Sequence, residues 1–241
     1  MYDKLVLFLY YILRSFIYPL IPRRFVAKSV SGEVVLITGG GFGLGRLLAQ
    51  RFAKLGAKVI IWDINVDNLE KTKAMIEADG AECHAFCCDV SDPQCVYKTA
   101  DRVRREVGHV TMLVMNAGIV NGSKLLDLPD DKIRKCFDVN VLSHFWLTKA
   151  FLPFMMKINN GHVISIDVSS DMFSLPLLSH TRFFPLCSHR FLRNACSTLH
   201  SNVVVIGYSC ARYANFCCAQ VTRTALMHFR AKLSLAAAKP N

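Results

Sequence analysis

The chain is 241 residues long, 52% of its residues are hydrophobic, and its formal net charge is +11. This length fits one domain with a sizeable core, and its ten cysteines, which form no CxxC pair and no regular disulfide spacing, indicate reduced thiols and no structural zinc site. The basic residues are not clustered among aromatic ones, so we expect no nucleic-acid partner, and because the cysteine and histidine spacings match no familiar ligand set, we expect no metal.

The N-terminal segment from Leu5 to Ile21 is apolar apart from Arg14 and Ser15. It is at the short limit for crossing a hydrocarbon core of about 30 Å, and Arg14 near its middle would cost roughly 2.5–3.5 kcal/mol there. We therefore expect a membrane-embedded or interfacial anchor; the alternative is a cleaved signal peptide, for which no small-residue cleavage site follows. The arginine pair at 23–24 predicts a cytosolic domain beyond it, so residues 1–28 form an anchor and its basic flank.

Short apolar runs then alternate with amphipathic segments. Glycines end several of the amphipathic segments, as they end helices. The pattern predicts strands at 33–38, 58–62, 83–88, 111–115 and 162–166, and helices at 44–55, 66–79, 94–107, 130–137 and 140–157. This regular alternation predicts an α/β fold, a Rossmann-type doubly wound parallel sheet, over residues 29–171.

A glycine-rich turn joins the first strand to the first helix, with the sequence Thr-Gly-Gly-Gly-Phe-Gly-Leu-Gly at 38–45. Glycines permit a tight turn and a close approach of the backbone to a pyrophosphate, which then lies at the positive end of the helix. Because a buried strand precedes the glycines and an amphipathic helix follows them, we interpret this turn as a dinucleotide site.

Two aspartates end the second and third strands. Asp63 stands eighteen residues beyond Gly45, where a carboxylate accepts hydrogen bonds from the adenosine ribose and repels a 2′-phosphate, so NAD is favoured over NADP. The alternative for Asp63 is an ordinary turn or helix-cap aspartate. Asp89 either contacts the adenine or caps the turn before Pro93.

These motifs, with Asn116-Ala117-Gly118 after the fourth strand and Asn140 in the following helical region, resemble the short-chain dehydrogenases/reductases, in particular their membrane-anchored retinol dehydrogenase branch. The resemblance implies that Asn140 holds a water in a proton relay. It also implies that helix 140–157 forms a homodimer contact, with plain core packing as the alternative. The cofactor contacts that it implies come from Gly39, Gly43, Leu44, Gly45, Asp63, Asp89, Asn116 and Gly118.

Catalysis in that family needs a serine after the fifth strand, a tyrosine about a dozen residues later and a lysine four beyond it. Ser170 stands at the serine position, but the first later tyrosine is Tyr208, displaced by about twenty-five residues and followed by Arg212 instead of lysine. We expect Ser170 to position the substrate oxygen, Tyr208 to exchange its proton and Arg212 to supply the cation. Arginine cannot give up a proton, so low or no turnover is one alternative. A chance pairing of Tyr208 with Arg212 is another.

The last segment, residues 172–241, is divergent: it holds eight Lys or Arg and no acid. We expect a fold that lacks its last strands and its substrate lobe. The resemblance implies an NAD(P)-dependent oxidoreductase on the endoplasmic reticulum membrane, with the main domain facing the cytosol, that acts on a lipophilic alcohol or ketone such as retinol or retinal. The alternative is a catalytically silent, truncated relative that binds at most a nucleotide or a protein partner.

Overall fold

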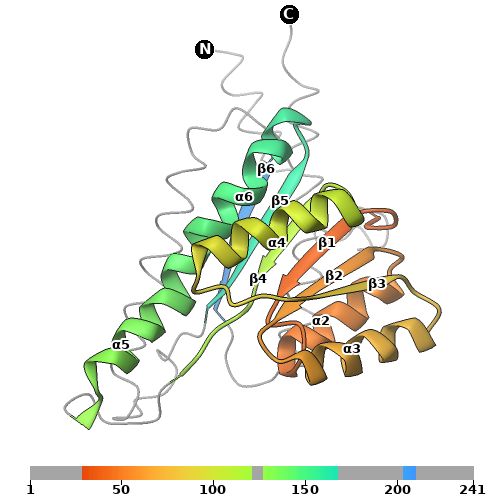
Figure 1. Ribbon diagram of the computed structural model, residues 1–241. Coiled ribbons are helices and arrows are strands. Elements are labelled where there is room, and N and C mark those ends of the chain that lie inside the picture. Colours follow the sequence, from red (N-terminus) through yellow and green to blue (C-terminus); the bar gives the residue numbers. More distant parts are fainter. Residues whose placement is uncertain (1–28, 121–126, 168–202, 210–241) are drawn as a thin grey trace, which may run out of the picture.

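The computed structural model describes residues 29–120, 127–167 and 203–209. Its centre is a six-stranded sheet in the order β3-β2-β1-β4-β5-β6, in which all neighbouring strands run parallel (Figure 1). This arrangement confirms the predicted Rossmann-type α/β fold. The strands are β1 (Val34–Thr38), β2 (Lys58–Asp63), β3 (Cys83–Cys87), β4 (Met112–Met115), β5 (Gly161–Asp167) and β6 (Val203–Ser209).

Helices cover both faces of this sheet (Figure 1). Local signals start two of them: the Asn65 side chain caps α3 by accepting from Asn68 N, and Asp92 caps α4 by accepting from Gln94 N just before Pro93. The helical elements are α2 (Gly43–Lys54), α3 (Val66–Ala78), α4 (Pro93–Glu106), α5 (Asp130–Phe137), the π-helix η4 (Asp138–Leu142) and α6 (Ser143–Lys157).

The core has two halves because successive strand side chains point to opposite faces. On one face, strand residues such as Ile37 and Ile61 pack against Phe52 of α2 and Ile76 of α3. On the other face, strand residues pack against α4 and α6, and the largest of them is Trp62, whose ring centroid lies 5.8 Å from that of Phe151. Both faces of the strands are therefore apolar, as parallel sheets require.

The sheet order places a topological switch point between β1 and β4. From β1 the chain moves to β2 and β3 on one side, and then returns to β4 on the other side of β1. Ligands of such sheets bind outside the carboxyl ends of the strands at this point. The carboxyl end of β1 is Thr38 and that of β4 is Met115, so the glycine-rich turn lies at the place where the fold itself favours a ligand.

Two features differ from the sequence-based expectation. The sheet has a sixth strand at 203–209, paired with β5, whereas five strands were predicted from the sequence, all of them before residue 167. The physical reason is the β-branched run Val203–Ile206, which favours a strand. The expected helix 140–157 also begins differently, because residues 138–142 form the π-helix η4.

No helix within the described ranges is long and apolar enough to cross a membrane. The predicted anchor at 5–21 lies outside those ranges.

Candidate dinucleotide site

Hydrogen bonds tie the ends of β1 and β4 together at the switch point. The hydroxyl of Thr38 accepts from the backbone N–H groups of Asn116, at 3.0 Å, and Ala117, at 3.1 Å. In return the Asn116 side-chain amide donates to the carbonyl oxygens of Thr38, at 3.0 Å, and Gly39, at 3.3 Å. Asn116 therefore links the end of β4 to the glycine turn, and its place beside the cofactor stays a prediction.

The glycines of the turn do two different things. A Cβ on Gly39 would lie 3.0 Å from Ala117 Cα, and a Cβ on Gly45 would lie 2.0 Å from the Gly39 carbonyl oxygen. Gly39 thus lets the turn approach the segment that follows β4, and Gly45 lets the start of α2 approach the turn. Gly43 has a φ of +57° and no atom within 4 Å of a Cβ built on it, so it borders open space where a ligand can approach the backbone.

Among the described residues, no side chain caps the N-terminus of α2. Its N-cap, Phe42, provides no side-chain acceptor, and the first turn, which contains Leu44, holds no acidic residue. The first N–H groups of a helix have no partner within the helix, and they carry its positive dipole end. An open backbone at Gly43 beside uncapped N–H groups fits a pyrophosphate.

Asp63, the last residue of β2, lies against the glycine turn. Its Oδ2 accepts from Gly41 N–H at 3.0 Å, and its Oδ1 accepts from Asn65 N–H at 3.0 Å. The carboxylate is half-buried and keeps further lone pairs for ribose hydroxyls. The bond to Asn65 shows that the same side chain also shapes a turn, and the ribose contact of Asp63 stays a prediction.

Asp89 makes the contacts of a turn-capping residue. Its Oδ1 accepts from the backbone N–H of Ser91 at 2.9 Å and from the Ser91 hydroxyl at 2.7 Å, and its Oδ2 accepts from Lys135 Nζ at 3.0 Å. Burial by itself would raise the pKa of Asp89, but the Ser91 bonds and the Lys135 ammonium bring that pKa below its usual value. The adenine contact of Asp89 stays a prediction.

Asn140 lies in the π-helix η4 and binds the segment that follows β4. Its Oδ1 accepts from Ile119 N–H and its Nδ2 donates to the Ile119 carbonyl oxygen, both at 2.9 Å. A Cβ on Gly118 would lie 3.3 Å from that Oδ1, so Gly118 lets the segment approach Asn140. Single π-helical turns occur frequently at functional sites. The water-holding role of Asn140 stays a prediction.

Of the three residues expected to act on the substrate, only Tyr208 lies among the described residues. It is in β6, opposite Ile166 of β5, and therefore near the carboxyl edge of the sheet, where the glycine turn also lies. Ser170 and Arg212 fall outside the described residues, so the structure does not bring this trio together.

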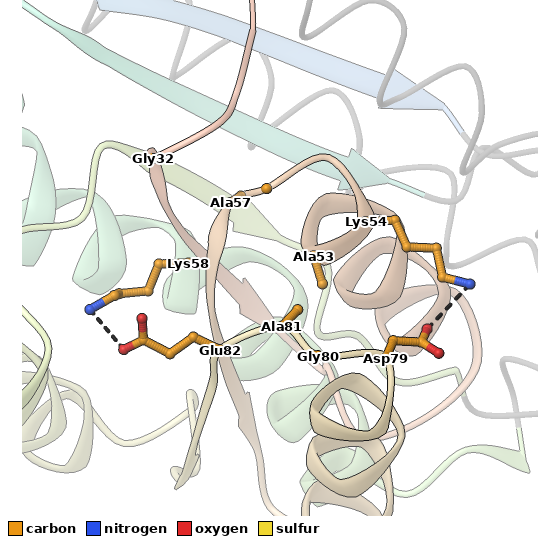
Figure 2. A pocket seen from close by; sticks show the side chains of 10 residues that line it. Gly32, Ala53, Lys54, Ala57, Lys58, Asp79, Gly80, Ala81 and Glu82 are labelled. Carbon is orange, nitrogen blue, oxygen red and sulfur yellow. Dashed lines mark ion pairs between the residues drawn. The ribbon is translucent and has the colours of Figure 1, made fainter.

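A hollow of about 650 Å³ lies at the opposite edge of the sheet, where Gly32 precedes β1 and Lys58 begins β2. Figure 2 shows its two ion pairs, Lys54 with Asp79 at 3.2 Å and Lys58 with Glu82 at 2.7 Å. Such partly exposed pairs contribute little, and the hollow is far from the switch point. Within the described residues no group of three His, Cys, Asp or Glu side chains is placed to hold a metal ion.

Two residues that shape the glycine turn, Arg46 and Thr72, were not predicted from the sequence. Arg46 donates to the Gly41 carbonyl oxygen and to the Thr72 hydroxyl. A signal for Arg46 was present in the sequence, because a cation in the first turn of a helix is repelled by the positive end of the helix dipole and is therefore unusual there. Thr72 has no such signal, because it reaches the turn from α3, more than twenty residues away along the chain.

Comparison with known proteins agrees with this geometry. The chain is 42% identical over 206 residues to human estradiol 17-beta-dehydrogenase 11, covering 84% of this chain and 68% of that protein. It is 47% identical over 165 residues to human epidermal retinol dehydrogenase 2, covering 68% of this chain and 53% of that protein.

Two solved structures share the fold. A metagenomic short-chain oxidoreductase in complex with NADP superposes with a TM-score of 0.74 at 25% identity, covering 83% of this chain and 92% of that one. A 7α-hydroxysteroid dehydrogenase in complex with NADH and a 7-oxo bile acid gives 0.70 at 28% identity, covering 75% and 71%. The family model for the short chain dehydrogenases matches residues 33–178. This chain therefore belongs to the short-chain dehydrogenase family, whose oxidoreductases use a nicotinamide cofactor.

Proposed function

We propose that the protein transfers a hydride between NAD and a lipophilic alcohol or ketone, such as retinol or a steroid. The observation that carries the proposal is the uncapped N-terminus of α2 beside the open backbone of Gly43, at the switch point of the sheet. When bound, the nicotinamide would supply or accept the hydride. The names of its relatives, an estradiol dehydrogenase and a retinol dehydrogenase, support a lipophilic substrate.

The preference for NAD over NADP rests on Asp63. Its carboxylate lies against the glycine turn, and a negative charge there would repel a 2′-phosphate. Titrating the protein with NADH and with NADPH tests this preference. We expect NADH to bind more tightly than NADPH, and we expect Asp63→Asn to reduce the ratio of the two dissociation constants. The matched control is Asp67→Asn, which removes an exposed carboxylate in the first turn of α3. It should leave the ratio of the NADPH and NADH dissociation constants unchanged. Equal affinities in the wild type would contradict the assignment.

For the proton transfer we propose Tyr208, with Ser170 orienting the substrate oxygen, Arg212 supplying a positive charge and Asn140 holding a relay water. A phenol has a pKa near 10, and a neighbouring cation lowers it toward the working range of an acid or base. We expect Tyr208→Phe to abolish retinol oxidation while NADH still binds. The control is Tyr97→Phe, on α4, which should leave retinol oxidation unchanged.

A second candidate function is nucleotide binding without turnover. The setting of Tyr208 in a strand and the arginine at position 212 favour it, because an arginine fills the site of a catalytic lysine with a different geometry. Wild-type protein that binds NADH but oxidises neither retinol nor estradiol would establish this second function.

We further propose that residues 5–21 anchor the protein in the endoplasmic reticulum membrane, with the catalytic domain in the cytosol. The glycosylation sequon Asn121-Gly122-Ser123 reports on which side of the membrane the domain lies, because only a lumenal domain would be glycosylated. We expect an unglycosylated chain that resists carbonate extraction, and release from membranes when residues 1–28 are deleted. Glycosylation at Asn121 would reverse the assigned orientation.

We also propose a homodimer through helix 140–157. Sedimentation of the protein tests it, with a monomer at all concentrations as the contrary result.

A further inference from the structure

Arg46 is the fourth residue of α2 and folds back onto the glycine turn. Its Nε lies 3.1 Å and its Nη2 2.5 Å from the Gly41 carbonyl oxygen, and the same Nε lies 2.9 Å from the Thr72 hydroxyl. The guanidinium carbon also lies 5.5 Å from the centre of the Phe42 ring. The side chain is half-buried, so its planar group is held by several partners in one orientation.

The peptide of Gly41 is therefore held from both sides. Asp63 Oδ2 accepts its N–H at 3.0 Å, while its carbonyl oxygen accepts from Arg46 and, at 3.0 Å, from the Thr72 hydroxyl. Thr72 is completely buried, so this hydroxyl cannot exchange its partners for water. These bonds fix the Gly41 peptide within the glycine turn.

The charge of Arg46 is not neutralised within the described part of the chain. Its hydrogen-bond partners are a carbonyl and a hydroxyl, and no described carboxylate forms an ion pair with it. The cation also stands in the first turn of α2, where it adds to the positive end of the helix dipole instead of offsetting it. A cation at the positive end of a helix is unfavourable in an isolated helix, and it becomes favourable when an anion binds at the helix N-terminus.

We propose that Arg46, acting with Thr72 on the Gly41 carbonyl, is a positioning residue that holds the glycine turn in the conformation that binds the cofactor pyrophosphate. The fork of the guanidinium reaches Gly41 and Thr72 at once, which a single ammonium cannot do with the same geometry. Arg46 acts through the backbone of the turn and makes no contact with the substrate. The inference rests on cofactor binding at this turn.

The test is a titration of the full-length protein with NADH, together with the KM for NADH and kcat in the wild type and in variants. Arg46→Met removes both the charge and the hydrogen bonds, and we expect it to raise the Kd and KM for NADH by about tenfold or more, the size of one lost charge-assisted bond, with a much smaller change in kcat. Arg46→Lys should restore only part of the loss. Arg51→Met removes an exposed arginine from the same helix and should leave both constants within twofold.

Thr72→Val, which is nearly the same size, keeps the proposal testable if Arg46→Met fails to fold. We expect Thr72→Val to weaken NADH binding several-fold. In the double variant with Arg46→Met, the increase in the NADH Kd should be smaller than the product of the two single increases, because both side chains act on one carbonyl. Unchanged NADH binding in Arg46→Met or in Thr72→Val would overturn the inference. Failure of the wild type to bind either NADH or NADPH would instead overturn the proposed function, so the two failures are distinguishable.

Discussion

Replacing Gly45 by alanine would place a methyl group 2.0 Å from the Gly39 carbonyl oxygen and 2.7 Å from Asn116 Nδ2. Both atoms belong to the hydrogen bond that ties β4 to the glycine turn, and the closer one is backbone that cannot rotate away. The start of α2 must therefore move or that bond must break. Overpacking of this kind costs about 1–3 kcal/mol, and loss of the hydrogen bond adds about 1 kcal/mol.

Two other glycines provide matched comparisons. Gly43 and Gly80 have φ angles of +57° and +79°, and neither has an atom within 4 Å of a Cβ built on it. Alanine at either position meets backbone strain of about 1–2 kcal/mol but no clash. Gly80 lies in the hollow at the opposite edge of the sheet, whereas Gly43 borders the ligand side of the turn.

Urea unfolding and NADH titration of the full-length protein separate these effects. We expect Gly45→Ala to lose about 2–4 kcal/mol of unfolding free energy and to weaken NADH binding at least tenfold. Gly43→Ala should lose less stability and still bind NADH poorly, and Gly80→Ala should lose stability alone. The reasoning is refuted if Gly45→Ala matches Gly80→Ala in both stability and affinity.

Two further predictions concern His144 and Asn140. Burial lowers the pKa of His144 to about 4, whereas a histidine in the unfolded chain titrates near 6.5. Between these values the unfolded chain binds one more proton than the folded chain. The free energy of unfolding is therefore greatest above pH 6.5 and falls by about 3 kcal/mol as the pH drops to 4. Urea midpoints at several pH values should therefore fall less steeply for His144→Leu than for the wild type, and equal slopes would disprove this origin of the pH dependence. Asn140→Ala removes both hydrogen bonds to Ile119, so hydrogen exchange of the Ile119 amide should accelerate and unfolding free energy should fall by about 1–3 kcal/mol; unaltered protection of that amide would show that the bonds do not hold the segment.

Much of the fold could be predicted from the sequence because its signals are local. The strand predicted at 58–62 ends one residue later in the structure, and the helix predicted at 130–137 has those bounds. Apolar runs of strand length and glycines at helix ends carry this information. The strand at 203–209 has the same kind of signal, but it was hidden within an acid-free region read as divergent.

The contacts that shape the site could not be predicted in the same way. The bond between Arg46 and Thr72 joins two helices, and no local pattern indicates such a pair. The π-helix η4 differs from an α-helix in its backbone bonding, which leaves no mark in side-chain periodicity. The glycine motif predicted a cofactor turn, but only the structure separates Gly43, which borders open space, from Gly45, which permits packing.

The central claim is that the glycine turn binds a nicotinamide dinucleotide. Isothermal titration of the full-length wild-type protein with NADH, and separately with NADPH, tests it most directly. We predict saturable binding of NADH at a single site, tighter than that of NADPH and at least tenfold weaker in Gly45→Ala. Absence of saturable binding of both dinucleotides at millimolar concentration would contradict it.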